Sequence, residues 1–274
     1  MSALDLIHAW DVPVAAAAVI GPAGVLHTTG PVDRPFPLAS VSKVLTALAV
    51  LVAVEEGSVD LDDPAGPPGS TVRHLLAHAS GLGPEGADPV TEPGARRIYS
   101  NAGFEVLAAH LEARTGIPFA TYLREAVVEP LALMSTRLEG SPAHGAVSTV
   151  TDLAVVAGEL LVPTIVGEAT IADATTVQLA GLAGVLPGFG RQDPNDWGLG
   201  FELRDGKQPH WTGSRNSPVT FGHFGRSGTF LWVDRAAALA LVVLTDRQFG
   251  EWAVRAWPVL SDAVLAEVAA TPPG

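Results

Sequence analysis

Short apolar runs separated by turn-forming residues open the chain. Two β-prone runs, Val14–Ile20 and Val25–Thr28, flank the turn formers Gly21-Pro22-Ala23-Gly24. Runs of this kind joined by a short glycine- and proline-containing turn are typical of a β-hairpin. The first run continues the apolar stretch that starts at Val12, so the sequence predicts that this strand is buried.

The hydrophobic pattern then changes from strand-like to helical. From Ala39 to Glu56 the chain is rich in Leu, Ala and Val, with Lys43 near its start. Gly57 follows, and glycine is the residue that most often ends a helix. The pattern predicts a long buried helix.

Between about Val59 and Gly190, short helical patterns alternate with loops rich in Pro and Gly. A mostly helical region is therefore predicted. Its helical segments are Thr71–His78, Asn101–Thr115, Pro118–Val127 and Thr149–Leu161.

Strand signals return near the end of the chain. β-Branched and aromatic runs separated by Gly and Asp turns predict antiparallel strands. These runs are Phe201–Leu203, Thr220–Phe224, Thr229–Val233 and Ala238–Leu244. The closing segment Trp252–Val268 has apolar residues at helical spacing, and we expect it to cover one face of the sheet together with the N-terminal segment.

Together these elements predict an α/β (α+β) chain, in which an antiparallel sheet is flanked by helices and joined by a mostly helical lobe. Residues 1–58 and 196–274 are expected to form the sheet lobe, including the long helix. Residues 59–195 are expected to form the helical lobe, and the two lobes to work as one continuous unit. The last residues, Thr271–Gly274, are expected to fray.

Composition narrows the possible functions. The chain has 274 residues, of which 47% are hydrophobic, and a chain of this size buries roughly three quarters of its unfolded surface. Its 29 acidic and 16 basic residues give a formal net charge of −13, which opposes nucleic-acid binding. The absence of cysteine excludes disulfides, thiol nucleophiles and thiolate metal sites.

Apolar runs also bear on location. None approaches the ~20 residues of a membrane span, since Val44–Val54 is stopped by Glu55 and Glu56. The first arginine is Arg34, so the cationic start of a secretory signal is missing. We therefore expect a cytoplasmic protein with no membrane partner.

Ser40 and Lys43 stand at the start of the long helix. Three residues along a helix place two side chains on one face, about 4.5 Å apart in rise. A serine hydroxyl needs a base to become a nucleophile, and burial lowers the pKa of a lysine enough for it to act as one. Taken alone, the pattern is a weak signal, because a serine that caps its helix and a lysine that snorkels at the surface also fit it.

Further segments make the chain resemble a known family. These segments are Phe36–Lys43, Glu56-Gly57, Leu61–Pro64 and Thr71–Leu82. With the two later motifs below, they resemble the serine β-lactamase and penicillin-binding protein superfamily, nearest to its class C and esterase-like (family VIII carboxylesterase-like) branch. The resemblance spans about Val14 to Val268 and implies the β-lactamase/DD-peptidase-like fold, with a cleft between the lobes.

The second motif, Tyr99-Ser100-Asn101, resembles the Tyr-x-Asn loop of that family. The resemblance implies that Tyr99 passes the Ser40 proton to the leaving group, and that Asn101 holds the substrate or Lys43 by hydrogen bonds. A cation at Lys43 would favour the anionic form of the Tyr99 phenol. By itself, the tripeptide also fits an ordinary turn that ends in a helix cap.

The third motif, His223-Phe224-Gly225, resembles the Lys-Thr-Gly strand of the family. His223 in place of lysine implies a weaker, pH-dependent cation for recognising a substrate carboxylate. The same correspondence pairs the backbone N–H of Arg226 with that of Ser40 as an oxyanion hole, and Gly225 leaves room for close approach. His223 also fits a strand histidine satisfied by a neighbour.

No metal or organic cofactor is implied. His74 and His78 have the four-residue spacing of helical metal ligands, but no Glu follows His74 and no third ligand is evident. The sequence therefore predicts a structural role for His78.

The resemblance implies a serine hydrolase that forms a Ser40 acyl-enzyme with a small-molecule ester, amide or lactam. A carboxylesterase acting on small esters comes first, because of His223, the missing export signal and the short chain. A β-lactamase or D-amino-acid peptidase (DD-carboxypeptidase) comes second. From another class, a catalytically silent binding module of the same fold stays open, and the sequence does not predict the oligomeric state.

Overall fold

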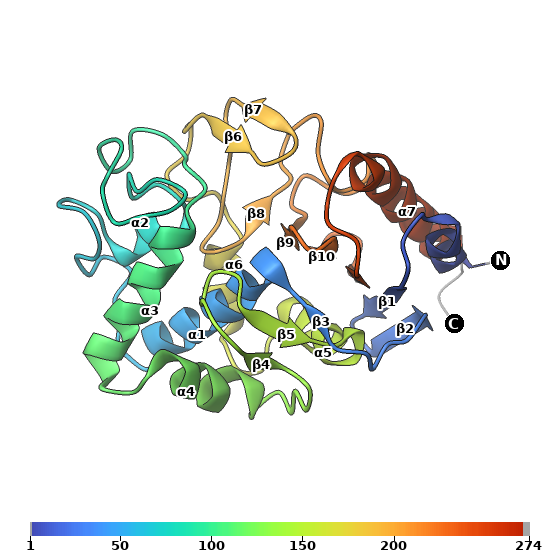
Figure 1. Ribbon diagram of the computed structural model, residues 1–274, viewed down its shortest axis with the longest axis horizontal. Coiled ribbons are helices and arrows are strands. Elements are labelled where there is room, and N and C mark those ends of the chain that lie inside the picture. Colours follow the sequence, from blue (N-terminus) through green and yellow to red (C-terminus); the bar gives the residue numbers. More distant parts are fainter. Residues whose placement is uncertain (1, 271–274) are drawn as a thin grey trace.

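The computed structural model describes residues 2–270, so the predicted fraying of Thr271–Gly274 lies outside the described residues. Within residues 2–270, both ends of the chain build one antiparallel sheet of six strands, in the order β2-β1-β11-β10-β9-β8 (Figure 1). The strands are β1 (Ala15–Gly21), β2 (Gly24–Thr29), β8 (Glu202–Leu203), β9 (Phe221–Gly225), β10 (Thr229–Asp234) and β11 (Leu239–Thr245). The N-terminal hairpin and the late strands are thereby confirmed.

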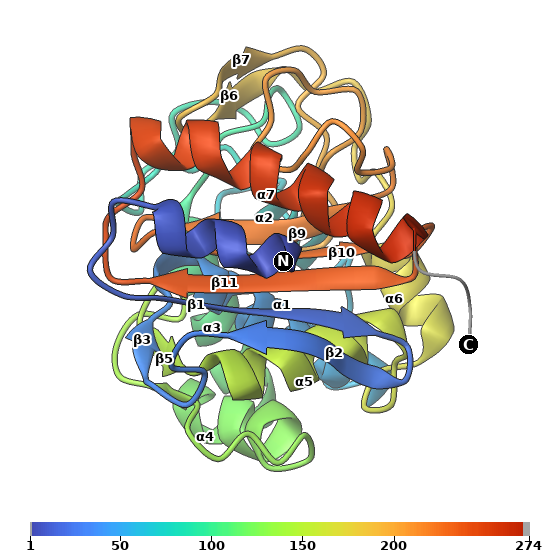
Figure 2. The same cartoon turned by 90° about the vertical axis from the view of Figure 1, so that its right-hand side faces the viewer.

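Both faces of this sheet are covered, which explains why its central strands are apolar throughout. Along β11, Ala240, Val242 and Leu244 face one core, whereas Leu239, Leu241 and Val243 face the other. In a sheet with one solvent-exposed face, polar and apolar residues would alternate along each strand instead. The helices η1 (Ala3–Ala9) and α7 (Glu251–Ala270) cover one face, as Figure 2 shows.

The opposite face packs against helices from the middle of the chain. Helix α5 (Val150–Leu161) lies against β1, β10 and β11. Helix α1 (Ser42–Glu55) lies between the sheet and two further helices, α3 (Asn101–Thr115) and α4 (Phe119–Leu123) (Figure 1). No helix in the described part of the chain is long and apolar enough to cross a membrane.

Short elements complete the fold. Two small antiparallel sheets have the orders β3-β5-β4 and β6-β7. The remaining bounds are β3 (Phe36–Pro37), η2 (Ala39–Val41), α2 (Val72–Leu76), η3 (Arg124–Val128, a π-helical turn), β4 (Arg137–Leu138), β5 (Ala146–Ser148), α6 (Glu168–Ala174), β6 (Gly184–Leu186) and β7 (Gly190–Gln192).

The predicted helices are also found, with one local difference. The predicted long helix begins as the single 3-10 turn η2 and becomes α-helical only at Ser42. The division at residues 58/59 and 195/196 stays a prediction. Helix α5 belongs to the segment 59–195, and it packs on the sheet rather than on α3 or α4.

Gly225, at the end of β9, holds the sheet against the turn that precedes α1. A side chain at this position would lie 2.3 Å from Leu38 O and 2.5 Å from Thr229 Oγ1. Such separations are below van der Waals contact, and both neighbours are fixed because Thr229 Oγ1 donates to Leu38 O at 2.8 Å. The close approach of these two segments therefore requires glycine.

We expect Gly225→Ala to lower the free energy of unfolding by about 1–3 kcal/mol, the usual cost of overpacking. The added methyl must push β9 away from Leu38, because backbone and a bonded hydroxyl cannot yield. Thermal unfolding followed by circular dichroism measures the change, as a melting temperature lower by about 2–4 °C per kcal/mol.

Gly158→Ala is the matched control. Gly158 lies inside α5, and a side chain there meets no other atom within 4 Å. Replacing an interior helical glycine by alanine should raise stability by about 0.5–1 kcal/mol. Equal destabilisation by the two variants would show that the contact at Leu38 is not what makes Gly225 necessary.

Candidate active site

Ser40 lies in the turn η2, which leads directly into α1. The preceding residue, Ala39, has a φ of 46°, in the left-handed region that alanine rarely adopts. Strain of this kind persists only where the surroundings fix the backbone. The hydrogen bond from Thr229 to Leu38 O supplies such a constraint immediately before Ala39.

The two serines of this segment have different environments. Ser42 is buried, and its hydroxyl accepts the Ala146 N–H at 2.9 Å, which ties α1 to β5. Ser40 instead lines two neighbouring cavities. Ser40 is therefore the serine that a substrate can reach.

Lys43 is fully buried in the first turn of α1. Its Nζ donates to Asn101 Oδ1 at 2.7 Å and to Ala143 O at 2.9 Å. The same atom lies 4.7 Å from the centroid of the Tyr99 ring and 5.3 Å from that of Phe104. Because a neutral amine has two hydrogens, it can keep both hydrogen bonds and still present its lone pair.

Burial is the main influence on the pKa of Lys43. It lowers this pKa to about 7, although the negative charges of Glu85 and Glu105 act to raise it. A large share of Lys43 is therefore uncharged near neutral pH. The desolvated lysine that the sequence requires is present, and the snorkelling alternative is wrong.

The start of α3 positions Tyr99. The Ser100 hydroxyl accepts the Gly103 N–H at 3.0 Å and so caps the helix. The Ser100 N–H donates to His78 Nδ1 at 3.1 Å, and the His78 ring lies 4.7 Å from the Tyr99 ring, centroid to centroid. His78 thus has the structural role predicted for it, because it holds the backbone beside Tyr99.

Asn101, the first residue of α3, is fixed at both ends of its side chain. Its Oδ1 accepts from Lys43, and its Nδ2 donates to Glu85 Oε1 at 2.6 Å. A carboxylate accepts only, so Glu85 determines which way the amide points. The prediction that Asn101 bonds Lys43 is confirmed.

The Tyr99 hydroxyl is buried and has no hydrogen-bond partner among the described residues. Burial raises the pKa of this phenol well above its usual value; the nearby Ser40 hydroxyl opposes the rise, and Glu85 adds to it. Lys43 loses its proton at a lower pH than Tyr99, so no ammonium is present when the phenol would ionise. The prediction that Lys43 favours the Tyr99 anion is therefore wrong.

His223 lies on β9 and is only 2% exposed. Its Nδ1 is 2.7 Å from Phe224 O, and because a carbonyl only accepts, Nδ1 carries the hydrogen and Nε2 presents a lone pair. Nε2 has no partner among the described residues. A neighbour therefore satisfies only one of the two ring nitrogens.

Burial, and after it the charge of Lys43, lower the pKa of His223 to about 3. The ring is therefore neutral at physiological pH. The sequence predicts a pH-dependent cation here, and that prediction is wrong, because a fully enclosed imidazole beside an amine resists protonation.

Two free backbone donors adjoin these side chains. The N–H of Ser40 precedes the first hydrogen bond of η2, and the N–H of Arg226 follows the end of β9. Neither N–H donates to another residue within the described part of the chain. Gly225 brings the two segments together, as described above.

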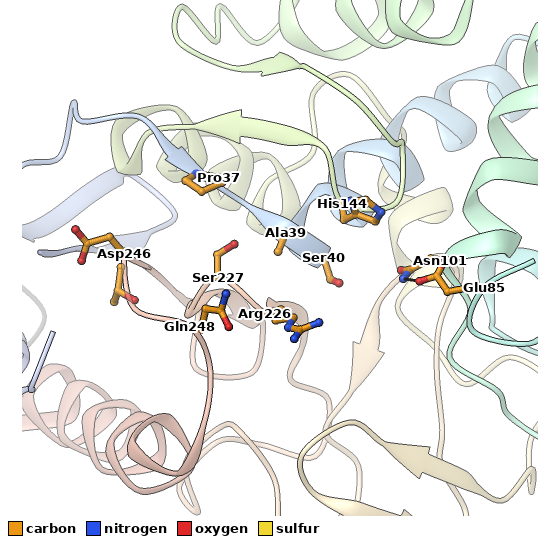
Figure 3. Close-up of a pocket in the computed structure, with 11 residues that line it drawn as sticks. Pro37, Ala39, Ser40, Glu85, Asn101, His144, Arg226, Ser227, Asp246 and Gln248 are labelled. Carbon is orange, nitrogen blue, oxygen red and sulfur yellow. Dashed lines mark hydrogen bonds between the residues drawn. The ribbon is translucent and has the colours of Figure 1, made fainter. Parts of the chain in front are cut away.

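Two cavities, of about 550 and 360 Å³, meet at Ser40, because Ser40, Asn101 and Arg226 line both. The wider cavity has polar side chains on two sides: Ser227 and Gln248 with Arg226 on one, His144 on the other (Figure 3). Apolar and aromatic side chains wall the narrower cavity. These are Leu186, Pro187, Trp197, Phe224 and Phe249.

The structure thus brings together the residues predicted for the site, namely Ser40, Lys43, Tyr99, Asn101, His223, Gly225 and Arg226. Tyr99 and His223 line the narrower cavity with Ser40, Asn101 and Arg226. The sequence misses Glu85 and the Ala143 carbonyl, since a loop carboxylate carries no periodic signal and a backbone carbonyl carries no signal of residue type. Within residues 2–270, no group of three or more His, Cys, Asp or Glu side chains is arranged to hold a metal.

Comparison with known proteins identifies the fold and the family. The Beta-lactamase family profile matches residues 6–265. A similar solved structure is the crystal structure of a beta-lactamase (Mb2281c) from Mycobacterium bovis, whose sequence is 62% identical to this one. The two structures superpose over 97% of this chain and 99% of that chain, with a TM-score of 0.96. The predicted fold is therefore confirmed.

More distant relatives share parts of the sequence or only the fold. Penicillin-binding protein 4* of Bacillus subtilis is 29% identical over 38% of this chain, and the match spans only 30% of that longer protein. The structure of EstCE1, a hydrolase with promiscuous acyltransferase activity, is 21% identical and covers 96% of each chain with a TM-score of 0.77, a likeness of fold alone. On the profile match and the identity to the Mycobacterium bovis protein, this chain belongs to the beta-lactamase family.

Proposed function

We propose that the protein is a serine hydrolase that works through an acyl-enzyme on Ser40, and that its substrates are small esters. The observation that carries the proposal is the buried Lys43, three residues after a serine that lines two cavities, with a pKa lowered to about 7. A neutral amine in this place is the base that a serine nucleophile needs.

In the acylation step, Ser40 Oγ attacks the carbonyl carbon of the substrate while its proton moves to Lys43 Nζ. The carbonyl π electrons move onto oxygen, and the free N–H groups of Ser40 and Arg226 stabilise that oxyanion. When the tetrahedral intermediate collapses, the bond to the leaving oxygen breaks. Tyr99 gives its proton to this oxygen and regains one from Lys43, so the relay ends neutral.

Deacylation repeats the sequence with water in place of Ser40. Lys43 takes a proton from the water as it attacks the ester carbonyl, and Ser40 Oγ leaves with a proton delivered through Tyr99. Because the pKa of Tyr99 is raised, the phenol is a proton carrier in both steps and never the resting base. Asn101 keeps the Lys43 amine oriented throughout.

An esterase is the first choice because apolar and aromatic side chains form most of the wall of the narrower cavity. Its aromatic walls suit a compact acyl group. His223 on the same wall is neutral, so it offers a substrate carboxylate no ionic partner at this position.

A β-lactamase or D-amino-acid peptidase is the second candidate. The 62% identity to a protein described as a beta-lactamase favours it. So does the segment shared with a penicillin-binding protein. A catalytically silent binding module is the third, and it predicts no covalent product with any substrate.

Intact-protein mass spectrometry separates these candidates. We expect a fluorophosphonate to add one label to the wild type and none to Ser40→Ala, because only a serine with a neighbouring base to accept its proton attacks phosphorus efficiently. A parallel incubation with a penicillin shows whether lactams acylate the same residue.

Ser42→Ala is the matched control and should keep the label, since the Ser42 hydroxyl is buried and bonded to Ala146. A label that survives in Ser40→Ala would overturn the nucleophile. The absence of any adduct with both probes would favour the silent module.

The pH profile of ester hydrolysis tests the base. Lys43 must be neutral to accept a proton, so kcat/KM should fall tenfold per pH unit below about 7 and level off above it. Burial lowers the pKa of the nearby His78 well below its usual value and that of His223 to about 3, so neither accounts for a step near pH 7.

Stopped assays of a neutral p-nitrophenyl ester between pH 5 and 9 give the profile. His144→Gln, which removes the histidine that lines the wider cavity, should retain the step near pH 7. A flat profile in the wild type, or a step that disappears with His144, would reject Lys43 as the base.

Lys43→Ala and Tyr99→Phe should each lower kcat by about 10²–10⁴, the range for one proton-transfer group. Because the two groups form one relay, the double variant should lose little more than the worse single variant. Steady-state kinetics of the three variants measure the coupling.

Tyr122→Phe serves as the control, because it removes the other of the two tyrosines. That hydroxyl donates to Glu56 at 2.6 Å and lines neither cavity. Losses that multiply in the double variant would mean that Lys43 and Tyr99 act independently.

A further inference from the structure

The guanidinium of Arg226 is an unpaired charge at the mouth of the candidate site. Arg226 lies in the turn between β9 and β10, is exposed, and lines both cavities that meet at Ser40. Its side chain makes no hydrogen bond or ion pair with any residue from 2 to 270. Most of the other arginines have a carboxylate partner, as Arg34 has in Asp246 and Arg191 has in Asp193.

Nothing in the two cavities neutralises this charge. The carboxylates that line the two cavities are engaged elsewhere. In the wider cavity, Glu85 accepts from Asn101, and Asp246 accepts from Arg34 and from the Val14 N–H. In the narrower cavity, Glu202 is paired with Lys207 and accepts the Trp211 side-chain N–H at 2.8 Å. Among the described residues that line either cavity, Arg226 is the one lysine or arginine. The site therefore holds a single fixed cation that is free to bind an anion.

Two neutral donors stand beside it. Ser227 and Gln248 line the wider cavity on the same side as Arg226 (Figure 3), and their side chains form no hydrogen bond within the described residues. A guanidinium, a hydroxyl and an amide N–H on one wall match the acceptor oxygens of a carboxylate. The formal net charge of −13 repels anions in general, so an anionic group needs a local cation to bind here.

We propose that Arg226, with Ser227 and Gln248, binds a carboxylate on the leaving-group arm of the substrate, which occupies the wider cavity. The inference rests on the proposed esterase function and narrows its substrate class to esters with a neutral acyl group and an anionic leaving group. The apolar cavity takes the acyl group. The cationic recognition that the sequence assigns to His223 thus belongs to Arg226, three residues later in the adjoining turn.

Two esters that differ only in this charge test the proposal: 4-(butyryloxy)benzoate and 4-(butyryloxy)benzamide. The measured quantity is the ratio of kcat/KM for the anionic ester to that for the neutral one. We expect Arg226→Gln to lower the ratio about tenfold and Arg226→Lys to keep most of it. Raising the salt from 0.05 to 0.5 M should lower the ratio in the wild type but not in Arg226→Gln, because salt screens an exposed ion pair.

Arg191→Gln is the matched control, since Arg191 is an exposed arginine on β7 that lines neither cavity. It changes the net charge by the same amount and should leave the ratio unchanged. A ratio within twofold of wild type in Arg226→Gln would overturn the proposal. An equal fall in Arg191→Gln would overturn it as well, because the effect would then come from net charge alone.

Binding to an inactive background separates this proposal from the proposed function. Ser40→Ala should bind 4-(butyryloxy)benzoate in isothermal titration calorimetry, and Ser40→Ala with Arg226→Gln should bind it about tenfold more weakly. If the wild type hydrolyses neither ester but this difference persists, the esterase assignment fails and the anion site stands. If both variants bind the anionic ester equally, the anion site fails whatever the activity.

Discussion

The removal of one amine from water is the constraint on which the site depends. Lys43 Nζ is enclosed by Asn101 on α3, the Ala143 carbonyl and the Tyr99 ring. Helix α1, the segment 99–101 and the loop that contains Ala143 must therefore meet at this point. The apolar surroundings of α1 exclude solvent from the same place. In our proposal, the cost of burying an ammonium makes this amine the base, and the rest of the fold maintains that enclosure.

The sheet contributes backbone groups and a charge rather than a titrating side chain. Strand β9 carries the neutral His223 and ends at Gly225, which lies against the turn that leads to Ser40. The turn that follows supplies one free N–H and, in our proposal, the cation that recognises the substrate. In this proposal the catalytic and the recognition groups are neighbours in sequence, between His223 and Ser227. They differ in charge because His223 is buried and neutral, whereas the Arg226 side chain is exposed and charged.

Much of this could be predicted from the sequence. Continuous apolar runs with flanking turn residues identify β1, β10 and β11, and the motifs around Ser40, Tyr99 and His223 identify residues that the fold brings to the same two cavities. Charge states could not be predicted, because the pKa of His223 or Tyr99 depends on how completely other segments enclose it. The contacts of Glu85 and of the Ala143 carbonyl could not be predicted either, since they depend on loop conformation and not on a pattern of residue types.

With Lys43 as the proposed base, its hydrogen bond to the Ala143 carbonyl links activity to the conformation of one loop. Ala143 belongs to the loop between β4 and β5, and its carbonyl is one of the two acceptors of the Lys43 amine. If that loop opens, water reaches the amine, its pKa returns toward that of a free lysine, and the resulting ammonium can no longer accept a proton. Local opening would therefore silence the enzyme well before global unfolding, and its activity would report the fraction of molecules in which this loop is docked.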